Sequence, residues 1–218
     1  MEINQVDSIL FDLDGTLWNA AVLYAKAWTV ALQQHGIDKI IDEEDIAGLI
    51  GLEQSFVIRS LIPALYLNKA SIIVAAVEVE TERLIQTEGA PLYKRVKEGL
   101  EELHQRYPLF IVSNCDKNVV KLFLKYHGLE LLFVDHRTHG ENHKSKFENI
   151  EDLIVKYNLK KPVYVGDTLS DQKQSELAKI PFVHVNYGFG RLENYMPSFS
   201  DFERLTAYFL QECYQPSK

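Results

Sequence analysis

The sequence predicts an α/β protein with a doubly wound, mostly parallel sheet and a small helical domain inserted into it. From Lys94 onward, short apolar runs alternate with amphipathic stretches, a pattern typical of strand–helix–strand units with right-handed crossovers. Between Leu17 and Glu88 the sequence shows helical patterns and no strand pattern. We therefore expect an α/β core formed by residues 1–17 and 89–218 and a helical insert formed by residues 18–88.

Five short apolar runs are predicted to be strands of this sheet. They cover residues 6–11, 108–112, 131–134, 162–165 and 181–185. Three of these runs end in small polar or acidic residues, namely Asp12 and Asp14, Ser113 and Asn114, and Gly166 and Asp167. Because ligands of parallel sheets bind at the carboxyl ends of the strands, we expect these side chains to converge on one edge.

Amphipathic stretches predict the helices, and their ends carry recognisable signals. Asp42 and Ser145 are expected to cap the helices that follow them, Gly128 is expected to end one, and Asn68 or Ser71 is expected to begin the long helix of the insert. The predicted helices cover residues 20–35, 42–47, 53–61, 71–87, 94–107, 118–127, 146–157, 171–179 and 201–213.

Composition excludes several classes of protein. The chain has 218 residues, 46% of them hydrophobic, and a net charge of −8 with no basic stripe, so nucleic acid is not an expected partner. No apolar run approaches the roughly 18 residues that span a bilayer, and the N-terminus shows no secretory signal. With only two cysteines, Cys115 and Cys213, far apart, the expectation is a reduced, cytoplasmic protein without a membrane partner.

The segment Asp12-Leu13-Asp14-Gly15-Thr16 carries the first chemical signal. Two carboxylates one residue apart at a strand end repel each other, and a bound divalent cation offsets that repulsion. Gly15 permits a tight turn that brings backbone N–H groups close to a ligand, and the Thr16 hydroxyl can hold Asp14 or an incoming oxyanion. Taken alone, the segment is also compatible with a strand followed by an ordinary polar turn.

Four motifs in this order resemble the haloacid dehalogenase-like superfamily, in its phosphatase branch. They are residues 12–16, Ser113-Asn114, a lysine at 144 or 146, and residues 166–171. The resemblance covers the whole chain, with the insert in the place of the small helical cap and the rest as the Rossmann-like core. Residues 162–190, which include Tyr187-Gly188-Phe189-Gly190, are most similar to phosphoglycolate phosphatase-like hydrolases.

The resemblance implies a role for each acidic residue. Asp12 would attack phosphorus and form an aspartyl-phosphate, and Asp14 would protonate the leaving alcohol and then activate water. Mg²⁺ would be held by Asp12, Asp167 and the backbone carbonyl of Asp14, with Asp171 as a ligand either directly or through water. An ordinary first-turn acid, favoured by the helix dipole, is the alternative interpretation of Asp171.

Phosphate binding is assigned to Ser113, Asn114 and a lysine. Ser113 and the backbone around Asn114 are expected to open a helix whose N–H groups favour anions, which is compatible with a plain capping role. Lys146 is the chosen charge-neutralising lysine, because Lys-Phe-Glu-Asn-Ile is similar to the start of this helix in the nearer relatives. Lys144 is the alternative, since many relatives place the lysine before a proline and this chain has none there.

The sequence therefore predicts a Mg²⁺-dependent phosphatase of a small phosphorylated metabolite, with phosphoglycolate as the leading candidate. A phosphosugar mutase of the same fold is the alternative, because its motif residues are identical. A dehalogenase ranks low, since that branch lacks the second aspartate, and a catalytically idle binding protein ranks low because all the motif residues are present.

Several other residues are interpreted as structural. His136, His139 and His143 are expected in one solvated loop rather than at a zinc site. Trp18 and Trp28 are interpreted as core residues, although Trp18 follows the catalytic turn and could face the substrate. Residues 48–53 resemble the family's specificity loop in position, with Glu53 and Arg59 as its chargeable neighbours.

Overall fold

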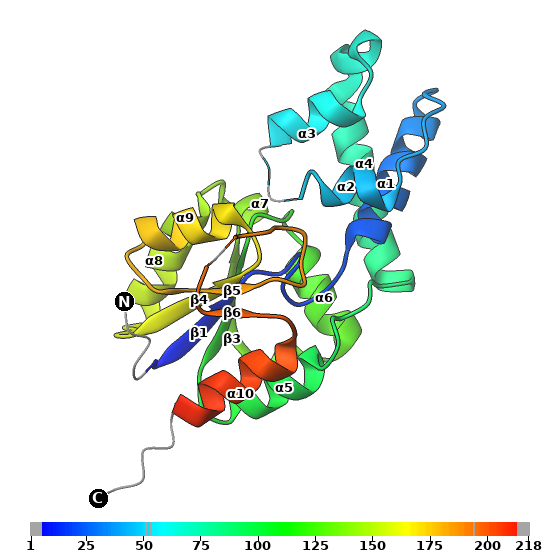
Figure 1. Cartoon of the computed structure of the whole chain (residues 1–218). Coiled ribbons are helices and arrows are strands. Elements are labelled where there is room, and N and C mark those ends of the chain that lie inside the picture. Colours follow the sequence, from blue (N-terminus) through cyan, green and yellow to red (C-terminus); the bar gives the residue numbers. More distant parts are fainter. Residues whose placement is uncertain (1–5, 51, 53, 194, 213–218) are drawn as a thin grey trace, which may run out of the picture. The chain divides into compact units, whose positions relative to one another are not determined.

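The computed structural model describes residues 6–50, 52, 54–193 and 195–212. The chain forms two compact units, one made of residues 1–19 and 91–218 and the other of residues 20–90 (Figure 1). Cys213, expected to be reduced, and Glu53, expected beside the specificity loop, lie outside the described residues. No helix in the described part of the chain has the length and apolar character needed to cross a bilayer.

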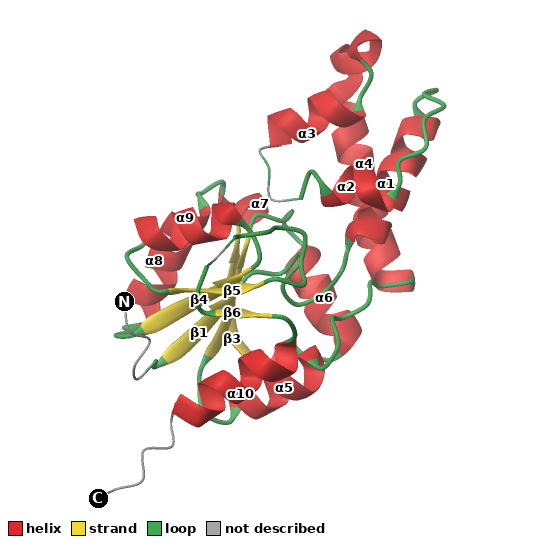
Figure 2. Ribbon diagram, in the orientation of Figure 1, coloured by secondary structure: helices red, strands yellow, loops and turns green. Residues whose placement is uncertain are grey.

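The first unit is built on a six-stranded sheet in which every neighbouring pair is parallel (Figure 2). The spatial order is β3-β2-β1-β4-β5-β6. The strands are β1 (Ser8–Phe11), β2 (Leu109–Ser113), β3 (Phe133–Thr138), β4 (Pro162–Gly166), β5 (Phe182–Val185) and β6 (Ser198–Phe199). The predicted α/β fold with a parallel sheet is confirmed, and β6 adds a short strand that the sequence analysis missed.

Helices cover both faces of this sheet, which explains why its central strands are buried throughout (Figure 2). On one face Leu10 packs in a buried cluster with Ile150 and Leu153 of α8 (Lys146–Tyr157). On the other face the ring of Phe11 lies 6.0 Å from that of Phe202 in α10 (Phe202–Glu212). Neighbouring residues of β1 thus point to opposite faces, as the period of a strand requires.

The remaining helices of this unit connect the strands. They are α5 (Val96–His104), α6 (Val119–His127), a 3-10 turn (Glu130–Leu132), α7 (His139–Asn142) and α9 (Leu169–Leu177). Gly128 ends α6 as predicted, in the left-handed conformation, and Ser145 begins α8 with its N–H and hydroxyl both donating to Glu148.

Two local predictions are wrong in this unit. The run 131–134 is a 3-10 turn followed by β3, which extends through Thr138. β3 is an edge strand with a single neighbour, so it is only partly buried and its sequence is polar. The apolar residues just before it, in the 3-10 turn, therefore resemble a buried strand more than β3 itself does. His136, His139 and His143 do not share a loop, since they lie on β3, on α7 and at the C-terminal cap of α7.

The second unit, residues 20–90, has helices joined by loops and no strand among its described residues. Asp42 caps α2 (Glu43–Ala47) as predicted, by accepting a hydrogen bond from the backbone N–H of Asp45 at 2.8 Å. The long helix begins neither at Asn68 nor at Ser71, because a 3-10 segment runs directly into it. The elements are α1 (Ala21–Gln34), α2 (Glu43–Ala47), α3 (Gln54–Leu61), a 3-10 segment (Ala64–Lys69) and α4 (Ala70–Thr87).

Candidate active site

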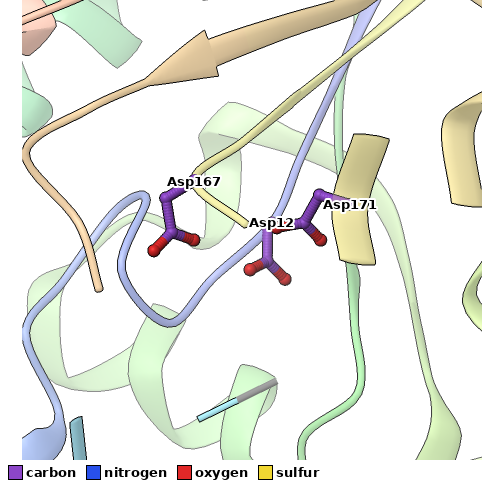
Figure 3. A group of neighbouring side chains, drawn as sticks. All are labelled: Asp12, Asp167 and Asp171. Carbon is purple, nitrogen blue, oxygen red and sulfur yellow. The ribbon is translucent and has the colours of Figure 1, made fainter. Parts of the chain in front are cut away.

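Three carboxylates meet at the carboxyl edge of the sheet (Figure 3). Asp12 directly follows β1, Asp167 directly follows β4, and Asp171 lies in the first turn of α9. One oxygen from each lies within 4.8 Å of the others, and all three side chains are buried. The convergence follows from strand order, because β1 and β4 are neighbours in register and end together.

Lys146, the first residue of α8, lies among these acids. Its Nζ donates hydrogen bonds to Asp12 Oδ1 at 2.8 Å and to Asp171 Oδ1 at 2.5 Å. Lys144 instead forms a surface ion pair with Asp152 at 2.5 Å. Of the two lysines weighed from the sequence, the structure thus brings Lys146 to the acids and leaves Lys144 outside.

Burial dominates the electrostatics of the group. It raises the pKa of Asp12 well above the ordinary value, helped by the charges of Asp171 and Asp167 and opposed by Lys146. Burial and the charge of Asp171 raise the pKa of Asp167 from 3.8 to about 7. Burial lowers the pKa of Lys146, but the charges of Asp12 and Asp171 outweigh it, so that pKa is well above 10.5. When all three acids are ionised, the single ammonium of Lys146 leaves an excess of negative charge that a cation can balance.

The surroundings of Asp167 fit a divalent cation. Its Oδ2 accepts hydrogen bonds from the backbone N–H groups of Phe189, at 2.7 Å, and Gly190, at 3.1 Å. Its Oδ1 is buried and has no hydrogen-bond partner among the described residues. A buried carboxylate oxygen without a partner is costly, and a metal ion removes that cost. The donors here are all oxygens, which is the set that Mg²⁺ prefers.

Asp171 differs from Asp167 in that both of its oxygens accept hydrogen bonds. Its Oδ2 accepts from the backbone N–H of Thr168 at 2.9 Å and from the Thr168 hydroxyl at 2.6 Å. Its Oδ1 is held by Lys146. This arrangement makes Asp171 a partner of the lysine and of the helix start, consistent with contact to a metal through water rather than directly.

The carboxylate of Asp14 is not a member of the group formed by the other three. It is buried, and its Oδ1 accepts a hydrogen bond from the indole Nε1 of Trp18 at 2.7 Å. The ring of Trp18 is completely buried, which excludes the interpretation that it faces the substrate. The structure thus groups three of the four motif carboxylates, and the fourth, that of Asp14, is hydrogen-bonded to Trp18.

The residues assigned to phosphate lie at two neighbouring strand ends. Ser113 is the buried last residue of β2, and Asn114, which follows it, is exposed. They do not open a helix as predicted, because α6 begins only at Val119, after a turn. Thr16 is buried, and its Oγ1 has no hydrogen-bond partner among the described residues. The Thr16 hydroxyl therefore does not hold Asp14 and is available to an oxyanion.

A sequence profile of haloacid dehalogenase-like hydrolases matches residues 9–185. The chain belongs to this family. It is 28% identical over 197 residues to a phosphoglycolate phosphatase of Aliivibrio fischeri, covering 85% of this chain and 86% of that protein. It is 28% identical over 171 residues to the pyrophosphatase PpaX of Listeria monocytogenes, covering 77% of each. A structure of a predicted phosphoglycolate phosphatase from Haemophilus somnus superposes with a TM-score of 0.81 at 22% identity, covering 95% and 100% of the two chains.

The family resemblance inferred from the sequence is therefore confirmed, and so is the hydrolase class. Three contacts of this haloacid dehalogenase-like site were not found by sequence reasoning. They are the indole of Trp18 on Asp14, the loop amides of Phe189 and Gly190 on Asp167, and Thr168 on Asp171. The glycine spacing of residues 187–190 was a usable signal for the second contact.

Proposed function

We propose that this haloacid dehalogenase-like phosphatase hydrolyses a small phosphorylated metabolite, of the phosphoglycolate kind, with Mg²⁺ as its cofactor. The observation that carries the proposal is the buried set of Asp12, Asp167 and Asp171 around Lys146, at the edge of the sheet where ligands bind. The names of the relatives favour a phosphate ester or a phosphoanhydride as the substrate.

Asp12 and Asp167 are the residues that would hold the metal, with the backbone carbonyl of Asp14 as a further ligand and Asp171 acting through water. When bound, Mg²⁺ supplies positive charge that offsets the repulsion between a carboxylate and a doubly negative phosphate. The unpartnered Asp167 Oδ1 supports this assignment.

The reaction itself is assigned to side chains of this chain. An oxygen of Asp12 attacks phosphorus, the bond to the alcohol oxygen breaks, and Asp14 gives that oxygen its proton. In the second step Asp14 takes a proton from water, the water oxygen attacks phosphorus, and phosphate leaves Asp12. Lys146 offsets the charge that develops on the transferred group. Ser113, Thr16 and the backbone at Asn114 would hold the phosphate oxygens.

A phosphosugar mutase uses the same motif residues, so the acids cannot separate the two reactions. The helical unit, residues 20–90, is proposed to act as the cap that selects the organic part of the substrate, as the sequence resemblance implies.

A screen of several dozen phosphorylated metabolites tests the proposal. We expect phosphate release from a small monoester in Mg²⁺ and none after chelation with EDTA. Pyrophosphate and hexose phosphates belong in the set, because free phosphate from the former or an isomer from the latter would redirect the assignment. A folded protein that releases no phosphate and shows no Mg²⁺ binding by calorimetry would instead be an idle binding protein.

A further inference from the structure

Trp18 is joined to Asp14 by both side chain and backbone. The indole N–H donates to Asp14 Oδ1 at 2.7 Å, in a buried environment. A bridge of the parallel type pairs the two backbones, and the N–H of Gly15 donates to the carbonyl of Trp18 at 3.1 Å. The two ends of the turn after β1 are therefore hydrogen-bonded to each other through the backbone, and the indole of Trp18 is hydrogen-bonded to the carboxylate of Asp14.

The position of Trp18 is fixed from two other directions. Its ring packs edge-on against Phe123 of α6, with centroids 4.9 Å apart and planes at 70°. Its backbone forms an antiparallel bridge with Leu92. The N–H of Asn19 donates to the carbonyl of Pro91 at 2.9 Å, so the segments that leave for and return from the helical unit are paired here.

We propose that Trp18 is a positioning residue for Asp14, an inference that rests on the proposed function. A carboxylate is planar, so a hydrogen bond that fixes one oxygen also fixes the direction of the other. General acid catalysis needs the donated proton within hydrogen-bond reach of the leaving oxygen, and small misplacements are costly. The indole N–H is a donor only, so it orients Asp14 without competing for the proton that Asp14 transfers.

A purely structural role is the competing explanation. A buried indole needs an acceptor for its N–H, and Asp14 is one. The two explanations differ in how they affect substrates whose leaving groups differ. A leaving alcohol that is a strong base needs the proton from Asp14, whereas a dinitrophenolate leaves without it.

Phenyl phosphate and dinitrophenyl phosphate make this comparison on the same aromatic ring, and kcat/KM reports the step in which the leaving group departs. For Trp18→Phe we expect kcat/KM to fall about tenfold or more with phenyl phosphate and less than about threefold with dinitrophenyl phosphate. The ratio of the two values does not depend on the fraction of the protein that is folded. An equal loss with both substrates would overturn the proposal.

The chain offers a matched control, because its second tryptophan, Trp28, is buried in α1 of the helical unit. For Trp28→Phe we expect the ratio of the two kcat/KM values to equal that of the wild type. If the wild-type protein releases phosphate from neither these esters nor any compound of the metabolite screen, the proposed function fails, which is distinct from a failure of the Trp18 assignment.

A second readout needs no activity. A proton–nitrogen correlation spectrum of the isotope-labelled protein contains two indole signals, and Trp28→Phe identifies the signal of Trp18. We expect Asp14→Ala to shift the Trp18 signal and to leave the Trp28 signal in place, because the mutation removes the acceptor. An unchanged Trp18 signal would show that the hydrogen bond is absent in solution, and the proposal would fall.

Discussion

Replacing Asp167 by Asn is expected to stabilise the metal-free protein above neutral pH and to remove its stabilisation by Mg²⁺. Asn has the shape of Asp, and its carbonyl oxygen can accept the same N–H groups of Phe189 and Gly190. What the substitution removes is a buried negative charge beside Asp12 and Asp171. The wild-type protein is expected to tolerate that charge only because a cation balances it.

The magnitude follows from the shift in the pKa of Asp167 from 3.8 to about 7. A shift of roughly three units, at about 1.4 kcal/mol each, corresponds to about 4 kcal/mol of folding free energy. Because the pKa of Asp167 is raised in the folded state, protonation of this side chain stabilises the fold. This stabilisation is fully present below about pH 4 and is lost as the pH rises through about 7. Above that pH the ionised side chain destabilises the metal-free fold by at most this amount.

Urea unfolding in the presence of a chelator, near pH 5 and near pH 8, measures the effect. We expect Asp167→Asn to gain stability over the wild type at the higher pH, by up to about 4 kcal/mol, and to gain much less at the lower pH. The control is Asp152→Asn, which removes a partly exposed carboxylate paired with Lys144 and should give the same small difference at both pH values. With Mg²⁺, only proteins that retain Asp167 should gain stability. The reasoning is refuted if Asp167→Asn destabilises the metal-free protein equally at both pH values.

Other substitutions separate the roles of the residues at the site. Lys146→Met should lower kcat/KM about a hundredfold or more, whereas Lys144→Met should stay within about threefold, and steady-state kinetics showing equal losses would contradict the choice of lysine. Gly188→Ala should weaken Mg²⁺ binding in calorimetry, because a β-carbon there collides with Asp167 Oδ2 and the Gly15 carbonyl; unchanged affinity would count against the loop's role. Ser113→Ala should raise KM several-fold in the same kinetic assay by removing one hydrogen bond to phosphate, and an unaltered KM would remove Ser113 from the binding site.

Much of the site was predictable because it depends on strand ends. Asp12 and Asp167 meet because the two runs that precede them are adjacent parallel strands, and the prediction needed only the apolar runs and the polar residues after them. Asp171 was identified through the family resemblance, and its capping contact with Thr168 was missed because the helix was predicted to begin at Asp171 rather than directly after Thr168.

Other features depend on contacts between distant segments, which local patterns do not reveal. The sixth strand has two residues and exists only because it pairs with β5. The side chain of Asp14 lies outside the three-carboxylate group and is bonded to Trp18, whose own place is set by packing against Phe123.

The assignment of Asp12 as the nucleophile is tested most directly by Asp12→Asn. The measurement is phosphate release from a nitrophenyl ester in Mg²⁺, with the wild type and the variant at equal concentrations of folded protein. The account predicts a loss of about a thousandfold or more, because an amide oxygen cannot form the covalent intermediate. Hydrolysis within tenfold of the wild-type rate would contradict the mechanism, whatever the natural substrate is.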